Sequence, residues 1–518
     1  MKRWGLILGP LLMVGVILIP WPEGPSPEAR RTAGVTVLMA AWWVTEAIPI
    51  AVTALLPLAL FPWFGILPSA KVAPAYANHL VFLFLGGFLL ALSLERWGLH
   101  RRIALRVVQA VGTGPRRLTF GFMLATALLS MWVSNTATVL MMLPIAMAVV
   151  RRLSAGATRD GRSSPEITAE AAESLGLVLM LSLAYAAGIG GMGTLIGTPP
   201  NIVFAGMLHQ IYPGAPEVGF LQWMEIGLPL VLVLLPLSFV VVQRVAPVVP
   251  LGEFRFEAGG AHIREELDAL GPLGRAERLV ATVFAATVLL WLTRSRLEIG
   301  SFVYPGWATL FPHPGYIHDA TVAVTMCIVL FLVPSGTVGP DGRGERLLAW
   351  ADARKGVPWG ILLLFGGGFA LAAAFQQSGL ALWMGGRLSG LGQLPLPALI
   401  LAVCLGVMFM TEVTSNTATA TLLLPILAST AGAIHVHPLL LMVPATLSAS
   451  CAFMLPVATP PNAIVFGSGW VTIPRMARTG VLLNLMAAVL ITLLALGPLR
   501  AVFDTRSPAW VGSSRGGC

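Results

Sequence analysis

The sequence predicts an all-α polytopic membrane protein of about eleven transmembrane helices, built from two inverted repeats that each contain a re-entrant helical hairpin. Hydrophobic residues make up 56% of the 518 positions and charged residues only 11%, whereas soluble domains carry roughly 25% charged residues. Apolar stretches long enough to cross a bilayer recur along the chain. A polar motif also occurs twice, and the arginines are distributed differently around its two copies.

The net charge of +9 reflects arginines that cluster in loops between apolar segments, as the positive-inside rule predicts. We therefore interpret the charge as a signal of topology and expect no nucleic-acid partner. The four cysteines are widely separated and show none of the spacings typical of metal ligands. No cofactor is expected.

Residues 1–78 are predicted to form N-terminal scaffold helices. The first apolar run could pass for a signal peptide, but so many spans follow it that we interpret it as an uncleaved first helix. Lys2 and Arg3 place its N-terminus in the cytoplasm. We expect a multi-pass protein of the cell (inner) membrane, in contact with membrane lipid. The first three spans are predicted near 4–20, 33–49 and 50–66.

The chain contains an internal duplication. The pentapeptide Ser-Asn-Thr-Ala-Thr begins at Ser134 and again at Ser415, 281 positions later, and flanking glycines keep the same register. A Thr-Pro-Pro-Asn element follows the pentapeptide in both halves. Two polar motifs in the same order make chance similarity a poor explanation. We assign residues 79–250 to the first repeat and residues 357–504 to the core of the second.

Residues 118–150 contain no charged side chain, although arginines flank them on both sides. Both flanks should be cytoplasmic, so this segment must enter and leave the membrane on the same side. Its two arms around the pentapeptide reach about 24 and 18 Å, less than the roughly 30 Å hydrocarbon core. We predict a cytoplasm-facing re-entrant hairpin with Ser134 at its tip.

The matching segment, 395–428, has few basic neighbours and should open to the outside. Matched units in opposite orientation form the inverted repeat of secondary transporters. Paired prolines at 197–201 and 458–462 stop a helix, so we predict that a membrane helix is broken there in each half.

The rest of the chain completes the predicted topology. A basic amphipathic segment at 98–112 is expected on the cytoplasmic surface, 251–276 forms a cytoplasmic inter-repeat loop, and 277–356 adds scaffold helices to the second repeat. The C-terminal tail, 505–518, is placed outside. The remaining spans are predicted near 79–97, 174–212, 223–246, 277–294, 319–334, 357–377, 435–474 and 479–500.

The polar motifs carry complementary chemistry. Freed carbonyls with Ser, Thr and Asn oxygens suit a small hard cation such as Na⁺, whereas freed amides and helix N-termini suit an anion. Neither motif contains Lys, Arg or His, so a bound anion must be compensated by helix dipoles and co-bound cations. Such residues often only hydrogen-bond neighbouring membrane helices, but their matched recurrence favours cation-coupled anion transport.

With these motifs the chain closely resembles the divalent anion/sodium symporter family, whose signature is paired Ser-Asn-Thr hairpin tips and paired Thr-Pro-Pro loops. The resemblance covers nearly the whole chain. It implies a central substrate site, Na⁺ as coupling ion, a homodimer, and elevator-like motion of the hairpin domain against a scaffold. The substrate contacts it implies are Ser134, Asn135, Thr136, Thr198, Pro199, Ser415, Asn416, Thr417, Thr459 and Pro460. The Na⁺ ligands it implies are Ser130, Ser134, Asn135 and Gly197 at one site, and Thr411, Thr414, Asn416 and Ala458 at the other.

The leading functional hypothesis is Na⁺-coupled symport of di- and tricarboxylates of the succinate, malate or fumarate type. The alternatives are a sodium-independent dicarboxylate exchanger of the same fold and a sodium/sulfate symporter. The sequence does not exclude a passive channel. A membrane-embedded enzyme is disfavoured, because Glu412 is the only intramembrane acid–base candidate. Glu412 could tune the second Na⁺ site, but we interpret it first as a structural hydrogen-bonding group. His435 and His437 are interpreted as solvated loop residues.

Overall fold

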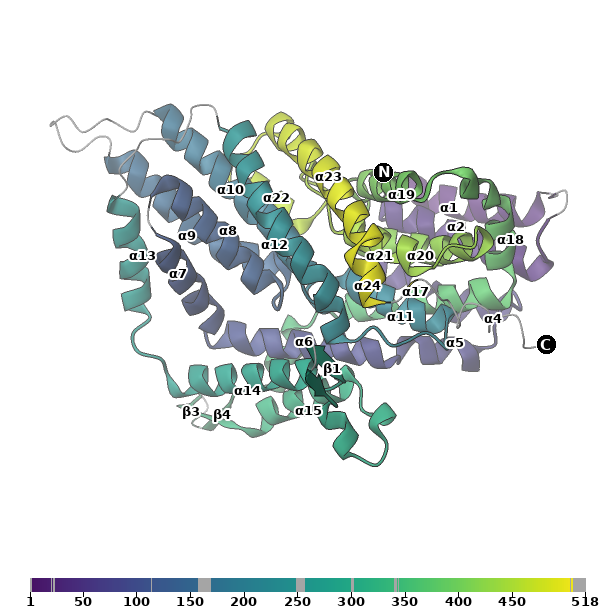
Figure 1. Cartoon of the computed structure of the whole chain (residues 1–518), viewed down its shortest axis with the longest axis horizontal. Coiled ribbons are helices and arrows are strands. Elements are labelled where there is room, and N and C mark those ends of the chain that lie inside the picture. Colours follow the sequence, from purple (N-terminus) through teal and green to yellow (C-terminus); the bar gives the residue numbers. More distant parts are fainter. Residues whose placement is uncertain are drawn as a thin grey trace.

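Helices form most of the chain in the computed structural model (Figure 1). It describes residues 2–19, 21, 24–112, 114–156, 169–247, 257–299, 302–339, 342, 344–503 and 505. The predicted C-terminal tail lies outside these residues except for position 505, as does the arginine-containing stretch 157–168. The all-α prediction needs one correction, because loop segments pair into two antiparallel two-stranded sheets. Strand β1 (Leu297–Ile299) pairs with β2 (Phe302–Tyr304), and β3 (Pro334–Val338) pairs with β4 (Gly344–Arg346).

The N-terminal helices follow local start and stop signals. The Ser26 side chain accepts a hydrogen bond from the Ala29 N–H, and Pro27 occupies the first helical position, where no N–H is needed. The span predicted at 50–66 is instead divided into two helices, and Pro57 lies in the first turn of the second, which begins at Leu56. The helices of this region are α1 (Lys2–Leu18), α2 (Pro27–Thr45), α3 (Ile50–Thr53), α4 (Leu56–Trp63) and α5 (Ser69–Tyr76).

A sharp helix-to-helix turn occurs at the same relative place in both halves. Gly98 and Gly379 have φ angles of 70° and 76°, in the left-handed region that glycine adopts without steric cost. Each glycine lets a long apolar helix turn directly into a shorter one. In the first half these helices are α6 (His79–Arg96) and α7 (Leu99–Val111), and in the second α17 (Trp359–Gln377) and α18 (Leu380–Arg387).

Each pentapeptide lies at the junction of two helices. The first junction joins α8 (Pro115–Ser130) to α9 (Asn135–Gly156), and the second joins α19 (Leu396–Thr411) to α20 (Asn416–Ala433). In both cases the motif asparagine is the first residue of the second helix. The pentapeptides therefore lie at helix tips, as predicted.

The break predicted at each proline pair falls earlier in the chain. In the first half, α10 (Ala169–Gly191) ends well before α11 (Pro199–Ile211), and in the second, α21 (Leu439–Ala449) ends before α22 (Pro460–Gly467). The prolines occupy the first turn of the new helix, where a missing N–H leaves no bond unmade. The unwound stretches are 192–198 and 450–459.

The inter-repeat segment is more structured than the predicted loop. It contains α13 (Glu257–Ala269), which packs against α7 and α9. Arg102 of α7 is buried and donates to the carbonyls of Gly271 and Leu270 and to the Glu277 carboxylate. The remaining helices are α12 (Phe220–Val245), α14 (Arg275–Leu292), η1 (Trp307–Leu310), η2 (Pro314–Tyr316), α15 (Asp319–Leu332), α16 (Trp350–Gly356), η3 (Ser389–Gln393), α23 (Ile473–Leu496) and α24 (Pro498–Val502).

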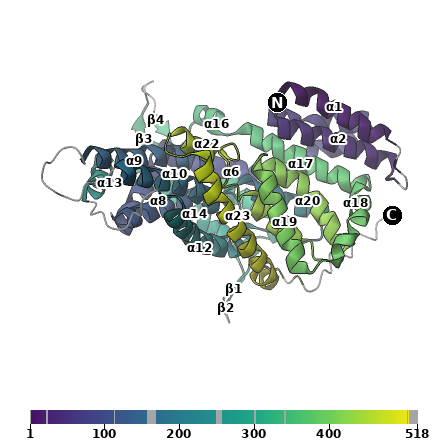
Figure 2. The ribbon, with the colours of Figure 1, turned by 90° about the horizontal axis from the view of Figure 1, so that it is seen from above.

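Helices of each half pack against helices of the other half. Helix α9 of the first half packs against α22 of the second, and α20 of the second packs against α11 of the first. The unwound stretches also meet, since the Cys451 Sγ lies 3.9 Å from the Met192 Sδ. Figure 2 shows α9 and α13 toward one end of the long axis and α1 and α2 toward the other.

Five described helical stretches are long and apolar enough to cross a membrane: Ser69–Arg96, Glu173–Gly191, Phe220–Val245, Trp359–Gln377 and Ile473–Val502. Several shorter apolar helical stretches accompany them, including those of α9, α15, α19 and α21. The chain is therefore suited to a multi-pass membrane arrangement, while the count of eleven spans stays a prediction.

Candidate functional site

At the first helix tip, the Ser130 hydroxyl has one proton to donate but lies close to two acceptor oxygens. The Ser130 Oγ lies 2.6 Å from the Asn135 Oδ1 and 2.8 Å from the Ala187 carbonyl oxygen. A serine hydroxyl carries one proton and can donate to only one acceptor at a time. Ser130 is fully buried, so the tip holds three close oxygens in a water-poor setting. Such a set suits a hard cation.

Gly197 belongs to the same neighbourhood. A Cβ atom added at Gly191 would lie 2.9 Å from the Asn135 Oδ1 and 3.1 Å from the Gly197 carbonyl oxygen. Glycine at 191 thus permits the Asn135 side chain and the unwound stretch to approach each other closely. The structure brings together three of the four predicted ligands of the first Na⁺ site: Ser130, Asn135 and Gly197. The fourth, Ser134, has its Oγ bonded by the Ala137 N–H at 3.2 Å.

The second tip repeats this arrangement. The Thr411 Oγ1 lies 2.7 Å from the Asn416 Oδ1 and 3.0 Å from the Ala449 carbonyl oxygen. Thr411 is fully buried, and again one hydroxyl proton faces two acceptors. Predicted ligands Thr411 and Asn416 therefore lie together.

Two other predicted ligands of the second Na⁺ site, Thr414 and Ala458, have hydrogen bonds of their own. The Thr414 hydroxyl lies against the Met410 carbonyl and the Thr419 hydroxyl, and the Ala458 N–H donates to the Leu455 carbonyl. Among the described hydrogen bonds, none joins either residue to the Thr411 and Asn416 cluster.

An asparagine from each proline motif holds the unwound stretch of its own half. The Asn201 Nδ2 donates to the carbonyls of Gly191 and Thr194, at 3.2 and 2.8 Å. The Asn462 Nδ2 donates to the carbonyls of Ala452 and Leu455, at 2.9 and 3.0 Å. The two sets match at a separation of 261 positions, the separation of the motifs themselves. These asparagines were not among the predicted site residues, although their place in a repeated element was a usable signal.

The predicted substrate residues lie at the N-termini of four helices. Helices α9, α11, α20 and α22 begin at Asn135, Pro199, Asn416 and Pro460. A helix N-terminus carries unpaired N–H groups and roughly +0.5 of a charge, which suits an anion. The Ser134 and Thr459 hydroxyls cap their own helices, whereas those of Thr198 and Ser415 make no capping bond. The last two predicted contacts, Thr136 and Thr417, lie in the first turns of α9 and α20.

Glu412 holds the second unwound stretch. Its buried carboxylate accepts hydrogen bonds from the backbone N–H groups of Phe453, Met454 and Leu455 and from the Asn484 Nδ2, at 2.8 to 3.1 Å. This geometry agrees with the structural interpretation of Glu412. In the first half, Met131 occupies the matching position, and the Thr194 hydroxyl bonds its carbonyl instead.

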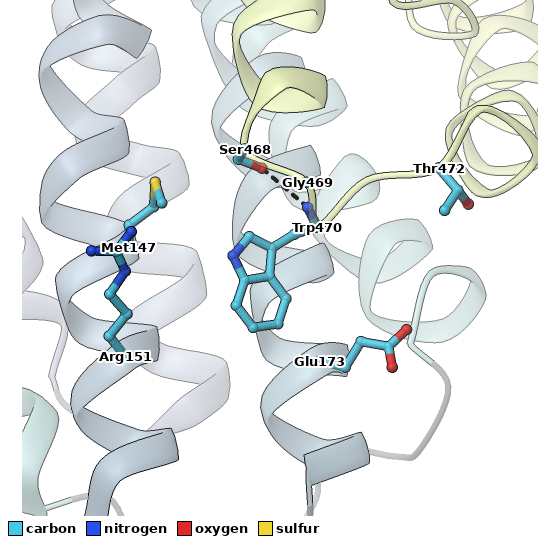
Figure 3. Close-up of a pocket in the computed structure, with 7 residues that line it drawn as sticks. All are labelled: Met147, Arg151, Glu173, Ser468, Gly469, Trp470 and Thr472. Atoms are coloured by element: carbon cyan, nitrogen blue, oxygen red, sulfur yellow. Dashed lines mark hydrogen bonds between the residues drawn. The ribbon is translucent and has the colours of Figure 1, made fainter.

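A cavity of about 450 Å³ lies at some distance from these motifs (Figure 3). It is lined by Met147 and Arg151 of α9, by Glu173 of α10, and by Ser468, Gly469, Trp470 and Thr472 of the loop between α22 and α23. Met147 follows Asn135 by 12 positions, or about 18 Å of helix. The cavity contains none of the predicted substrate contacts, so the candidate site is defined by the helix tips.

The histidine interpretation needs a correction. His435 is exposed, as predicted, and has a φ of 57°, but His437 is only 6% exposed and therefore not solvated. A cluster of His79, Glu217 and His318 also escaped the sequence analysis, since its members are far apart in the chain.

Known proteins resemble the chain over nearly its whole length. The model of the "Sodium:sulfate symporter transmembrane region" family matches residues 1–499. The chain belongs to this family. The family assignment made from the hairpin motifs is therefore confirmed.

Relatives of this chain include proteins named "Sodium-dependent dicarboxylate transporter SdcS". The one from Staphylococcus saprophyticus is 42% identical over 490 residues, 94% of this chain and 90% of the relative. The one from Staphylococcus aureus (strain NCTC 8325) is 41% identical over 494 residues, 94% and 89% of the two chains.

Two solved transporters share the fold of this family member. The YdaH transporter of Alcanivorax borkumensis aligns with a TM-score of 0.57 at 14% identity, over 91% of this chain and 98% of its own. MtrF of Neisseria gonorrhoeae aligns with a TM-score of 0.56 at 13% identity, over 95% and 94% of the two chains. The family and its apolar helices make this chain a multi-pass membrane protein.

Proposed function

We propose that this protein is a secondary active transporter that couples Na⁺ to the uptake of di- and tricarboxylates of the succinate, malate or fumarate type. The carrying observation is the matched pair of oxygen clusters, Ser130 with Asn135 and Thr411 with Asn416, in which one buried hydroxyl proton faces two acceptors. A Na⁺ ion at each cluster would relieve this shortage of donors. The names of the relatives at 41 and 42% identity agree with this substrate class.

Coupling follows from electrostatics. A dicarboxylate near the helix tips meets four partial positive charges from helix N-termini but no cationic side chain of either motif. Two bound Na⁺ ions add the positive charge that offsets a dianion in a low-dielectric setting. The anion should therefore bind well only after Na⁺. Thr198 and Ser415, whose hydroxyls do not cap their helices, are the first candidates to donate to its carboxylates.

The remaining expectations belong to the same proposal. The two tips form re-entrant hairpins of inverted repeats within about eleven spans, with the N-terminus cytoplasmic and the C-terminus outside in the cell membrane. Asn201 holds the first unwound stretch, and Asn462 and Glu412 hold the second, which supports tips that move as rigid units. We assign these units an elevator-like movement within a homodimer.

Uptake into proteoliposomes tests the proposal. Labelled succinate, citrate and sulfate are supplied with an inward gradient of Na⁺ or choline. Succinate uptake should require Na⁺ and should carry net positive charge if more than two Na⁺ accompany a dianion. Unchanged succinate uptake in choline would overturn symport and favour the exchanger. Na⁺-dependent uptake of sulfate alone would favour the second candidate, a sulfate symporter. The name of the matching family model supports this candidate.

A further inference from the structure

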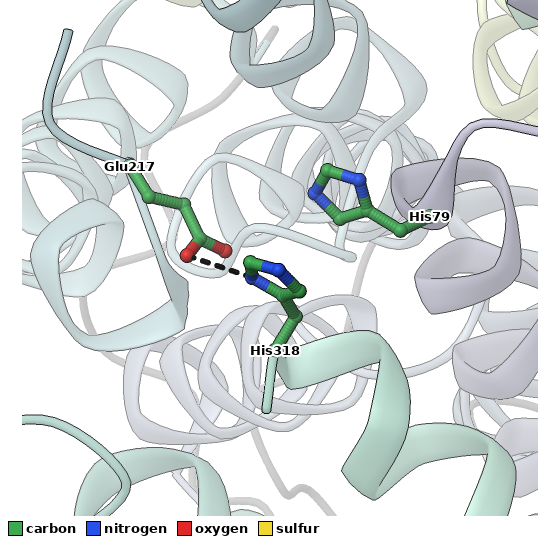
Figure 4. Close-up of side chains that lie close together, drawn as sticks. All are labelled: His79, Glu217 and His318. Carbon is green, nitrogen blue, oxygen red and sulfur yellow. Dashed lines mark hydrogen bonds and ion pairs between the residues drawn. The ribbon is translucent and has the colours of Figure 1, made fainter. Parts of the chain in front are cut away.

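A cluster of two histidines and a glutamate lies outside the candidate transport site (Figure 4). His79 begins α6, Glu217 lies in the loop between α11 and α12, and His318 immediately precedes α15. One potential ligand atom from each side chain lies within 4.8 Å of the other two. The His318 Nδ1 is 3.0 Å from the Glu217 Oε2. Three distant chain segments thus present nitrogen and oxygen ligands to one point.

We propose that His79, Glu217 and His318 bind a divalent transition-metal ion of the zinc type. Imidazole nitrogen and carboxylate oxygen are the ligands that Zn²⁺ takes in proteins, often with a water molecule as fourth ligand. Two of the three ligands are imidazoles, which disfavours Mg²⁺, Ca²⁺ and Na⁺ because these ions prefer oxygen ligands.

The geometry requires only a small adjustment. Ligands at ~2.0–2.1 Å from a tetrahedral zinc lie about 3.3 Å apart, so the widest of the present separations must shorten by about 1.5 Å. All three side chains are partly exposed, and their rotamers can make this change. Water and ions can reach the cluster, because His318 and Glu217 are 35% and 32% exposed.

A simple ion pair does not account for the cluster. An ion pair with Glu217 needs one histidine, yet the His79 ring stacks on His318 with centroids 4.8 Å apart, and His209 lies 5.8 Å from His79. The hydrogen bond to Glu217 raises the pKa of His318, and bringing further imidazoles beside a protonated ring is unfavourable. A metal ion would satisfy both rings in their neutral form.

The nearby arginine does not prevent cation binding. Arg294 lies 3.7 Å from the Glu217 Oε2, but its Nε bonds the buried Asp319 carboxylate at 2.6 Å. The two carboxylates of Glu217 and Asp319 and the one guanidinium of Arg294 together carry one net negative charge. His318 and Arg294 both contact the Oε2 atom of Glu217, and the carboxylate can offer either of its two oxygens to the metal ion.

The cluster should face the outside. Helix α6 runs from His79 to the arginine-containing α7, and arginines mark the cytoplasmic side. The opposite end of α6, about 27 Å away, is then external. Metal ions of the medium would reach the cluster there.

Metal binding to the full chain, purified in detergent through a tag without histidine, tests the proposal. Zn²⁺ should raise the melting temperature in a concentration-dependent manner, because it binds the folded state, and Mg²⁺ should not. His79→Ala and His318→Gln should each weaken Zn²⁺ binding by at least tenfold. The Gln variant can retain a hydrogen bond to Glu217, and melting in EDTA verifies that both variants fold.

His313→Ala is the matched control, because His313 is exposed and stacks on Tyr316 outside the cluster. It should bind Zn²⁺ as the parent protein does. Bound Co²⁺ should give a visible absorption typical of four-coordination that both cluster variants lose. Equal Zn²⁺ affinity in the parent and in His79→Ala would overturn the site, as would equal weakening by His313→Ala. Binding is measured without transport, so a failure of the proposed symport leaves this result intact.

Discussion

The Thr411 Oγ1 lies 2.7 Å from the Asn416 Oδ1, across the short connection between α19 and α20. The same relation joins Ser130 and Asn135 in the first half. In both halves the hydroxyl also faces a carbonyl from another helix. A buried hydroxyl with two acceptors leaves one oxygen poorly served, and a bound cation is the natural remedy.

Removal of either hydroxyl should lower Na⁺ affinity. In Thr411→Val and Ser130→Ala a cation loses one oxygen ligand, a loss of roughly 1–3 kcal/mol or about 5- to 150-fold. Na⁺-dependent thermal stabilisation in detergent measures it. Thr430→Val is the matched control, because its hydroxyl bonds only back to the Ile426 carbonyl of its own helix. Parent-like Na⁺ affinity in both test variants would remove these hydroxyls from the cation sites.

The two motif asparagines should respond alike to a change of charge. Asn135→Asp and Asn416→Asp retain oxygen for the cation but place a negative charge against an anionic substrate. Both variants should lose dicarboxylate transport while retaining at least part of their Na⁺ binding. Uptake in proteoliposomes and Na⁺-dependent melting provide the two measurements. Asp variants that fold and transport at parental rates would exclude these residues from the substrate site.

Glu412 should matter for the shape of the second unwound stretch. In the parent protein, a carboxylate oxygen of Glu412 accepts hydrogen bonds from backbone N–H groups. In Glu412→Gln an NH₂ group can replace that oxygen, and the buried N–H groups then lose their acceptor. We expect a loss of stability of roughly 1–3 kcal/mol, measured as a lower melting temperature without Na⁺. Glu225→Gln, an exposed change on α12, should have little effect. Equal melting of Glu412→Gln and the parent would show that the carboxylate is dispensable for stability.

The first hairpin should begin and end on the cytoplasmic side. Cysteines at Arg116 and Arg151, one at the start of α8 and one in α9, should resist an impermeant thiol reagent added outside intact cells and react after permeabilisation. The parent chain reports labelling of the native cysteines. External labelling of only one position would mean that the segment crosses the membrane, contrary to the hairpin model.

The sequence alone determined the membrane class, the family and the position of both helix tips. It could do so because apolar length, arginine distribution and repeated motifs are local properties that survive without a folded structure. The family resemblance also pointed to Ser130, Asn135, Thr411 and Asn416, and the two residues of each pair lie five positions apart and meet across a tight connection.

Only the tertiary structure decided which carbonyls complete the clusters and which histidines meet. Ala187 and Ala449 contribute backbone oxygens from 57 and 38 positions away, and every residue type carries the same carbonyl, so no side chain marks them. His318 and Glu217 are 101 positions apart and meet only because α6, α12 and α15 start near the same place. Long-range packing creates such meetings, and a local pattern in the sequence carries no trace of them.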